Sequence, residues 1–98
     1  MPRPYLALLT VTVRLEGAKS LKDKRMVVRS LKDGVRSKFD AAVAEIDGLD
    51  EVSRSVIAFG GLASSRRRAD VLLAKLENHL ERRFGDLDLT ISGDIVEL

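Results

Sequence analysis

The pattern of apolar and polar positions opens with a two-residue period, which is typical of a strand with one buried face. In residues 5–15 an apolar run leads into alternation with threonine and arginine. The apolar members of this alternation are Leu9, Val11, Val13 and Leu15. The pattern predicts a first strand that buries one face in the core.

The period then changes to that of a helix. The apolar positions at helical spacing are Leu21, Val28, Leu31, Val35 and Phe39. Ser20 and Asp23 resemble a capping box, in which a side-chain oxygen accepts a hydrogen bond from a free N–H of the first turn. These signals predict a helix over residues 21–38.

Two further strands are predicted in the middle of the chain. Residues 41–47 and 55–63 are β-permissive and flank a polar turn at residues 48–52. Gly60 and Gly61 lie inside the second of these strands, which indicates a bulge or a close backbone approach there.

The last quarter of the chain predicts a second helix and a final strand. Ser64 or Ser65 caps the helix, and Gly85 ends it. Its apolar positions are Ala69, Leu72, Leu73, Leu76, Leu80 and Phe84. Alternation returns in residues 87–92, and Gly93 predicts a kink before the apolar tail.

Elements in the order β-α-β-β-α-β indicate an α+β fold of the ferredoxin-like type. In this fold a four-stranded antiparallel sheet is covered on one face by two helices. A length of 98 residues fits one domain, and no linker or long repeat divides the chain. We therefore expect residues 1–98 to form a single ferredoxin-like domain.

Composition indicates the cellular compartment and excludes chemistry that needs cysteine. Without cysteine, the chain has no disulfide, thiolate metal site or thiol nucleophile, which suits a reducing compartment. The N-terminal apolar run reads as a strand rather than a cleavable signal. No segment approaches the roughly 20 apolar residues of a membrane helix. We expect a cytoplasmic protein without a membrane partner.

Charge is divided unevenly along the chain. Residues 19–38 hold eight Lys or Arg and only two acids, so this segment carries +6 while the rest of the chain carries −4. Such asymmetry favours a negatively charged partner, nucleic acid among them.

The basic residues of the first helix fall on one side of it. At 100° per residue they lie within about 80° of helix surface, beside the apolar stripe. They are Lys22, Arg25, Arg29, Lys32 and Arg36, which form a basic ridge on this helix. Because the two helices of this topology are antiparallel, we expect Arg66, Arg67 and Arg68, the arginine triplet, to lie near Arg36 and Lys38.

Three arginines in a first helical turn oppose the helix macrodipole, and a bound phosphate would relieve the conflict. The ridge and the triplet are therefore candidate nucleic-acid-binding residues.

A structural interpretation of the same charges remains open. Long basic side chains cover the edge of an apolar stripe while their charges stay in water, and Asp33 then pairs with Arg29 or Arg36. The acidic hairpin turn, with Asp47, Asp50 and Glu51, is expected near the start of the helix. There it would neutralise basic residues, namely Lys19, Lys22 and Lys24.

Other chemistry finds little support. Glu45 and the hairpin acids offer carboxylates to a hard cation, but the spacing of a calcium loop is absent, and Asp47 facing Arg54 is the simpler account. His79, the single histidine, has no nucleophile or second ligand near it in sequence, so a surface or core-margin position is expected. We predict no metal, no cofactor and no catalytic residue.

The two functional versions of this fold were also compared with the sequence. An RNA-recognition module needs aromatic residues stacked on its central strands, and here only Phe59 and Tyr5 are available. A phosphatase-like version needs a glycine-rich anion loop after the first strand, and residues 15–19 do not provide one. A phosphate-tracking helix face is the better candidate.

Three segments resemble the YlxP family of small bacterial proteins. They are Gly17-Ala18-Lys19-Ser20-Leu21-Lys22-Asp23-Lys24-Arg25, Lys38-Phe39, and Val43-Ala44-Glu45-Ile46-Asp47. The resemblance implies a ferredoxin-like fold and a gene near those of transcription and translation factors, with no established activity. Lys19 and Val52 depart from the family pattern, which commonly has histidine and tryptophan at these positions.

The sequence therefore leads to one principal hypothesis and two alternatives. The principal hypothesis is a non-enzymatic RNA- or ribosome-associated binding module that uses the basic helix face. The first alternative is a protein-interaction module or homodimer that pairs through an edge strand or the uncovered sheet face, where Thr10, Thr12, Thr90 and Ser92 are expected. The second alternative is a small enzyme with a phosphorylated substrate.

Overall fold

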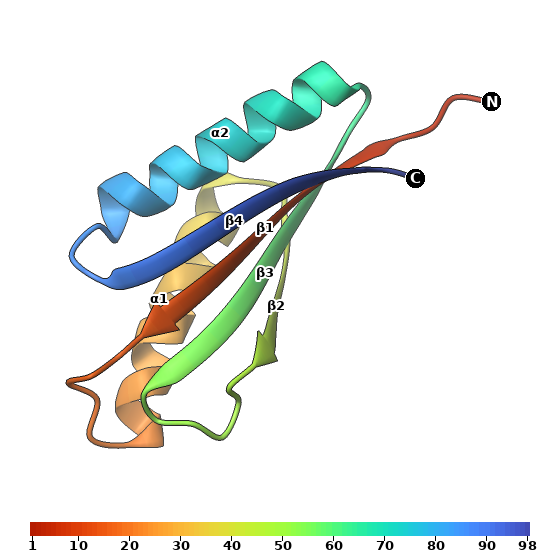
Figure 1. The fold of residues 1–98 in the computed structure, drawn as a ribbon. Coiled ribbons are helices and arrows are strands. Elements are labelled where there is room, and N and C mark those ends of the chain that lie inside the picture. The colour runs from red at the N-terminus through yellow and green to blue at the C-terminus, as the bar shows by residue number, and fades with distance from the viewer.

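The computed structural model describes residues 1–98, and its six elements follow the predicted order (Figure 1). They are β1 (Tyr5–Arg14), α1 (Leu21–Lys38), β2 (Ala42–Asp47), β3 (Arg54–Ala63), α2 (Arg66–Arg83) and β4 (Asp88–Glu97). The bounds of α1 are those that the hydrophobic period predicts.

The four strands form one sheet in the order β2-β3-β1-β4, and every neighbouring pair is antiparallel. β1 lies at the centre and pairs along its whole length with both β3 and β4. Both helices pack on one face of this sheet, and the two termini lie at the same end of it (Figure 1). The ferredoxin-like fold is thus confirmed.

The core lies between the sheet and the two helices. One residue in two along β1 is fully buried, because successive side chains of a strand point to opposite faces. Fully buried members of the core are Leu9, Val11, Val13, Leu31, Val35, Ile57, Phe59, Leu76 and Leu80. Removing a buried leucine or isoleucine side chain from such a core typically costs about 2–5 kcal/mol.

Serine side chains begin both helices, as predicted. The Ser20 hydroxyl accepts a hydrogen bond from the backbone N–H of Asp23, whose carboxylate accepts one from the backbone N–H of Lys19. At α2 the cap is Ser65, which accepts from the backbone N–H of Arg68. These bonds satisfy donors that an isolated first turn leaves free.

The two glycines of β3 mark a close approach rather than a bulge. β3 pairs with β1 without a register shift, with Gly61 opposite Ala7. A Cβ on Gly61 would come within 2.5 Å of Leu72 on α2, so glycine lets the helix pack closely on the strand. The register shift of the sheet lies in β2, between Glu45 and Asp47. Likewise, β4 runs through Gly93 without a change of register, so no kink interrupts its pairing.

The two helices meet at their C-terminal ends. The rings of Phe39, just after α1, and His79 on α2 lie 5.5 Å apart in an edge-to-face arrangement. Gly34 of α1 lies beside Phe84, the C-cap of α2, and its missing side chain leaves room for that ring. This crossing decides which basic residues are neighbours.

Candidate functional site

The basic ridge of α1, which consists of Lys22, Arg25, Arg29, Lys32 and Arg36 and is named the α1 ridge from here on, lies on the surface of the folded protein. Lys22, Arg25, Arg29 and Arg36 are exposed, and Lys32 is half-buried. The ion pairs of the structure are Lys24–Glu45, Arg54–Asp47 and Arg54–Glu51, so none of them neutralises the ridge. In particular, the expected pairing of Asp33 with Arg29 or Arg36 does not form.

Four members of the ridge border a shallow hollow of about 260 Å³ beside β2. The lining residues are Arg25, Val28, Arg29, Lys32, Asp33, Arg36 and Glu45. Of its two carboxylates, Glu45 is already held by partners beneath the surface. The hollow therefore presents more positive than negative charge to a ligand.

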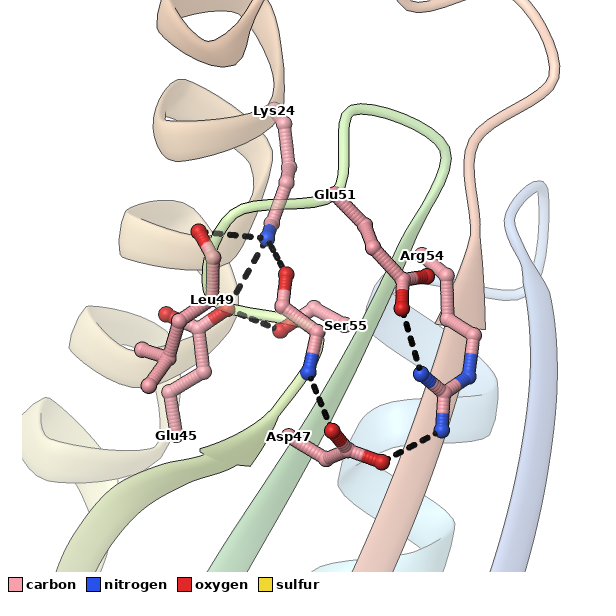
Figure 2. A network of polar contacts seen from close by, with 8 residues as sticks. Lys24, Glu45, Asp47, Leu49, Glu51, Arg54 and Ser55 are labelled. Carbon is pink, nitrogen blue, oxygen red and sulfur yellow. Dashed lines mark hydrogen bonds and ion pairs between the residues drawn. The ribbon is translucent and has the colours of Figure 1, made fainter.

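A buried lysine lies under the first turn of α1 (Figure 2). The Lys24 side chain is only 1% exposed. Its ammonium lies 3.2 Å from the Glu45 carboxylate and donates hydrogen bonds to the backbone carbonyls of Gly48 and Leu49. The Ser55 hydroxyl donates a hydrogen bond of 2.5 Å to the same carboxylate. We name Lys24, Glu45 and Ser55 the Lys24 cluster.

The Lys24 cluster ties the β2–β3 turn to α1. Gly48 in this turn has φ of 73°, and a Cβ there would lie 2.6 Å from the carbonyl oxygen of Arg54, so the turn requires glycine. Burial by itself raises the pKa of Glu45, but hydrogen bonds from Ser55 and Lys24 and the charges of Lys24 and Lys32 outweigh burial. The net pKa of Glu45 is therefore lowered, and its carboxylate stays ionised.

The sequence interpretation paired Lys24 with the hairpin acids and did not predict its burial, although a signal for burial was present. Positions 24, 28, 31 and 35 share one helix face, and the other three are apolar and buried. A lysine on this stripe has to be buried with a partner or displace the helix. Its partner, Glu45, is distant in sequence, so only the folded chain identifies it.

The acidic hairpin is occupied by its own arginine (Figure 2). Arg54 lies 2.7 Å from Asp47 and 3.3 Å from Glu51, which confirms the expected Asp47–Arg54 pair. Hydrogen bonds from Arg54 and from the backbone N–H of Gly48 lower the pKa of Asp47. The hairpin does not pair with Lys19 or Lys22. No group of three or more His, Asp or Glu side chains is arranged to hold a metal ion.

The arginine triplet does not join the α1 ridge, contrary to expectation. The Arg66 guanidinium lies over the Tyr5 ring, 5.7 Å from its centroid. Arg67 and Arg68 line a hollow with Leu62 and Lys75. The end of α1 instead meets His79, thirteen residues after Arg66, which corresponds to about 20 Å along a helix. The helices are antiparallel in sense but offset, so the start of α2 lies away from the end of α1.

His79 lies at the crossing of the two helices. It is 9% exposed, between the rings of Phe39 and Phe84. Burial, and then the positive charges of Lys38 and Arg83, lower the pKa of His79 below 6.5. The imidazole is therefore neutral at neutral pH, and its place at the margin of the core is one of the two positions expected from the sequence.

The uncovered sheet face, named the open face below, is more apolar than the sequence suggests. Thr10, Thr12, Thr90 and Ser92 lie there, as expected from the alternation of β1 and β4. Cross-strand partners share a face, so the register adds residues of β2 and β3. These additions, together with two leucines of β1, are Leu6, Leu8, Ala42, Ala44, Val56, Ala58, Gly60 and Leu62. The same register places charged residues at the ends of this face, namely Arg14, Arg54, Asp88 and Asp94. The polar residues thus cover only part of the face.

Comparison with known proteins identifies a family and a fold. A family model described as "Protein of unknown function (DUF503)" matches residues 6–92. The de novo designed protein Foldit4 has a TM-score of 0.55 at 6% identity, with 93% of this chain and 96% of that chain covered. A dimeric ferredoxin-like protein from an uncultured marine organism has a TM-score of 0.50 at 12% identity, with 96% and 95% covered. Such identities show the shared fold alone. No curated protein matches this chain.

None of the helices is long and apolar enough to cross a membrane.

Proposed function

This chain belongs to the DUF503 family of unknown function, and we propose that it is a non-enzymatic module that binds RNA or the ribosome through the α1 ridge. The proposal rests on one observation. Five basic side chains lie along one side of α1, and none of them forms an ion pair with an acidic residue. From Lys22 to Arg36 they span about 21 Å of helix length, enough to contact several phosphates of one strand.

The arrangement favours phosphate contacts over base recognition. Arginine and lysine side chains supply charge-assisted hydrogen bonds to phosphate oxygens. The open face carries no aromatic residue on its central strands that would stack with bases, because Phe59 points into the core. On the basis of the three segments that resemble YlxP proteins, we propose that this member of the family is YlxP-like and acts in the cytoplasm. The genes near which YlxP proteins are found also support an RNA partner.

The test is binding to ribosomal RNA across salt concentrations, with Arg25, Arg29 and Arg36 changed together to Glu. For single-stranded RNA the slope of log K against log salt is about −0.7 per phosphate contact. The triple variant is expected to bind more weakly and to lose about 2 from the magnitude of this slope. All three side chains are exposed, so the fold should survive.

A matched control reverses Arg67, Arg68 and Lys75, which changes the net charge equally on α2. Retained binding in this control assigns the effect to the α1 ridge. Salt-independent binding, or an equal loss in both triple variants, would contradict the proposal.

A homodimer through the open face is the second candidate. Leu62, Leu6 and Val96 form one apolar row across this face, and Leu62 is 66% exposed. Exposed apolar patches often mark interaction sites. Three ten-residue strands and one six-residue strand, spaced about 4.8 Å apart, give a sheet face of roughly 600 Å². Two such faces would bury about 1,200 Å² in total, which is the low end for a specific interface. The similar protein from a marine organism is described as dimeric, which agrees with this use of the fold.

A further inference from the structure

A second basic hollow lies where the C-terminal ends of the two helices meet. Its volume is about 340 Å³, and every residue that lines it is polar or charged. The lining residues are Lys38, Asn78, His79, Arg82 and Arg83, named the helix-end pocket below. It lies on the α2 side of α1, whereas the hollow beside the α1 ridge lies toward β2.

The charge in the helix-end pocket exceeds what the helices themselves require. Each helix C-terminus carries a partial charge of roughly −0.5, which a basic side chain in the last turn complements. Two such ends contribute about −1, while Lys38, Arg82 and Arg83 contribute three positive charges. None of the three takes part in an ion pair. A local excess of about two positive charges remains.

His79 lines the pocket with its ring, while its Nε2 faces Gly34 of α1 rather than the hollow. This nitrogen is buried without a hydrogen-bond partner. The ring cannot turn freely, because Phe39 and Phe84 pack edge-to-face on it. Burial first, and then the positive charges of Lys38 and Arg83, lower the pKa of His79. Cations from two helices thus crowd around one fixed imidazole without a counter-ion from the chain.

We propose that the helix-end pocket binds a phosphate dianion, either free or as a terminal phosphomonoester. A dianion matches the excess of two charges, and guanidinium groups pair with phosphate oxygens through parallel N–H bonds. Asn78 offers an amide donor to the remaining oxygens. The site is independent of the α1 ridge, whose partners are the phosphodiesters of an RNA strand.

The single histidine of the chain makes the test direct. The NMR signal of His79 is followed while inorganic phosphate replaces chloride at constant ionic strength. We expect a saturable shift with a Kd of about a millimolar or tighter. The same experiment repeated over pH should show a higher pKa for His79 with phosphate, because the anion offsets Lys38 and Arg83.

Variants locate the ligand. Lys38→Gln and Arg82→Gln should each weaken phosphate binding about tenfold, the usual effect of losing one charge-assisted hydrogen bond. The matched control is Arg67→Gln, the same change at the other end of α2, which should bind phosphate as the parent does. Absence of a saturable shift, or an equal loss in the control, would overturn the proposal.

Two further arms identify the source of the phosphate and separate the two proposals. A 5′-phosphorylated dinucleotide should shift the His79 signal, while its 5′-hydroxyl counterpart should not. Equal binding of the two dinucleotides would contradict a dianion site. The triple reversal in the α1 ridge should weaken RNA binding yet leave the phosphate-dependent shift intact, so each proposal fails or stands by itself.

Discussion

Lys24 occupies a helix position where the pattern calls for an apolar residue, and the surrounding residues satisfy its charge. A buried ammonium loses several kcal/mol of hydration, which only a close carboxylate and further hydrogen bonds offset. Glu45 provides the carboxylate, and the carbonyls of Gly48 and Leu49 accept hydrogen bonds from the same ammonium. With the hydrogen bond from Ser55 to Glu45, these contacts hold four segments together: the start of α1, β2, the turn that follows it and the start of β3.

Truncation of this lysine tests that role. Lys24→Ala should lower the free energy of unfolding by about 3–5 kcal/mol, because it leaves the Glu45 charge buried without its partner. Lys22 lies two residues before Lys24 on the exposed side of the helix, so Lys22→Ala should change the free energy of unfolding by less than about 0.5 kcal/mol. Urea unfolding followed by circular dichroism measures both. A loss below about 1 kcal/mol for Lys24→Ala would show that water can take the place of its ammonium.

Between elements, His79 packs its ring at the crossing of the two helices. The ring lies among Phe39 and Lys38 at the end of α1 and Arg83 and Phe84 at the end of α2. No acidic group is among the causes that shift its pKa, so protonation gains no compensating ion pair within the chain. The crossing of α1 and α2 is therefore sensitive to the charge of this one ring.

This sensitivity predicts a loss of stability in mildly acidic solution. The pKa of His79 in the folded state is lower than 6.5, so near and below pH 6.5 the unfolded chain binds more protons. Stability should fall as the pH drops from 6.5 toward the folded-state pKa and level off below it. Thermal unfolding at a series of pH values measures the loss.

His79→Gln supplies the comparison, since its amide does not titrate. The stability of the variant should change less with pH than that of the parent between about pH 7 and pH 5. Glu45 and Asp47, whose pKa values are lowered, lose their contributions only at more acidic pH, below their ordinary values of 4.5 and 3.8. Parallel curves for parent and variant would contradict this account of His79.

At the scale of the whole molecule, the sheet separates the two basic surfaces from the open face that is the candidate dimer surface. The helices lie on one face, together with the α1 ridge and the helix-end pocket, while the open face looks the other way (Figure 1). A second copy docked on the open face would leave both basic surfaces accessible. Self-association and phosphate binding are therefore expected to be independent.

Leu62→Glu tests, in one variant, the dimer through the open face and the independence of dimer formation from RNA binding. Leu62 is largely exposed, so a charge there should not disturb the monomer, but it should prevent close packing of two open faces. Light scattering across protein concentrations should show a dimer for the parent and a monomer for the variant, while RNA affinity stays unchanged. Met26→Glu, at an exposed apolar position on α1, is the control for the oligomeric state. A parent that is monomeric at all concentrations would remove the second candidate function.

Local signals determined the elements of this protein. The bounds of α1 follow from the capping box at Ser20 and the apolar period after it, because helix formation depends on residues a few positions apart. The strand alternation and the order of elements were sufficient for the ferredoxin-like fold. The α1 ridge also followed from the sequence, since helix geometry alone places its residues on one side.

Only the tertiary structure decided which charges are neighbours. The offset of the helices placed Lys38 beside Arg82 and Arg83 rather than beside the arginine triplet. The pairing of Lys24 with Glu45, and the apolar part of the open face, depend on strand register and on contacts between residues far apart in sequence. A one-residue change of register moves a side chain to the opposite face. Such contacts arise from the packing of the whole chain, which no local pattern encodes.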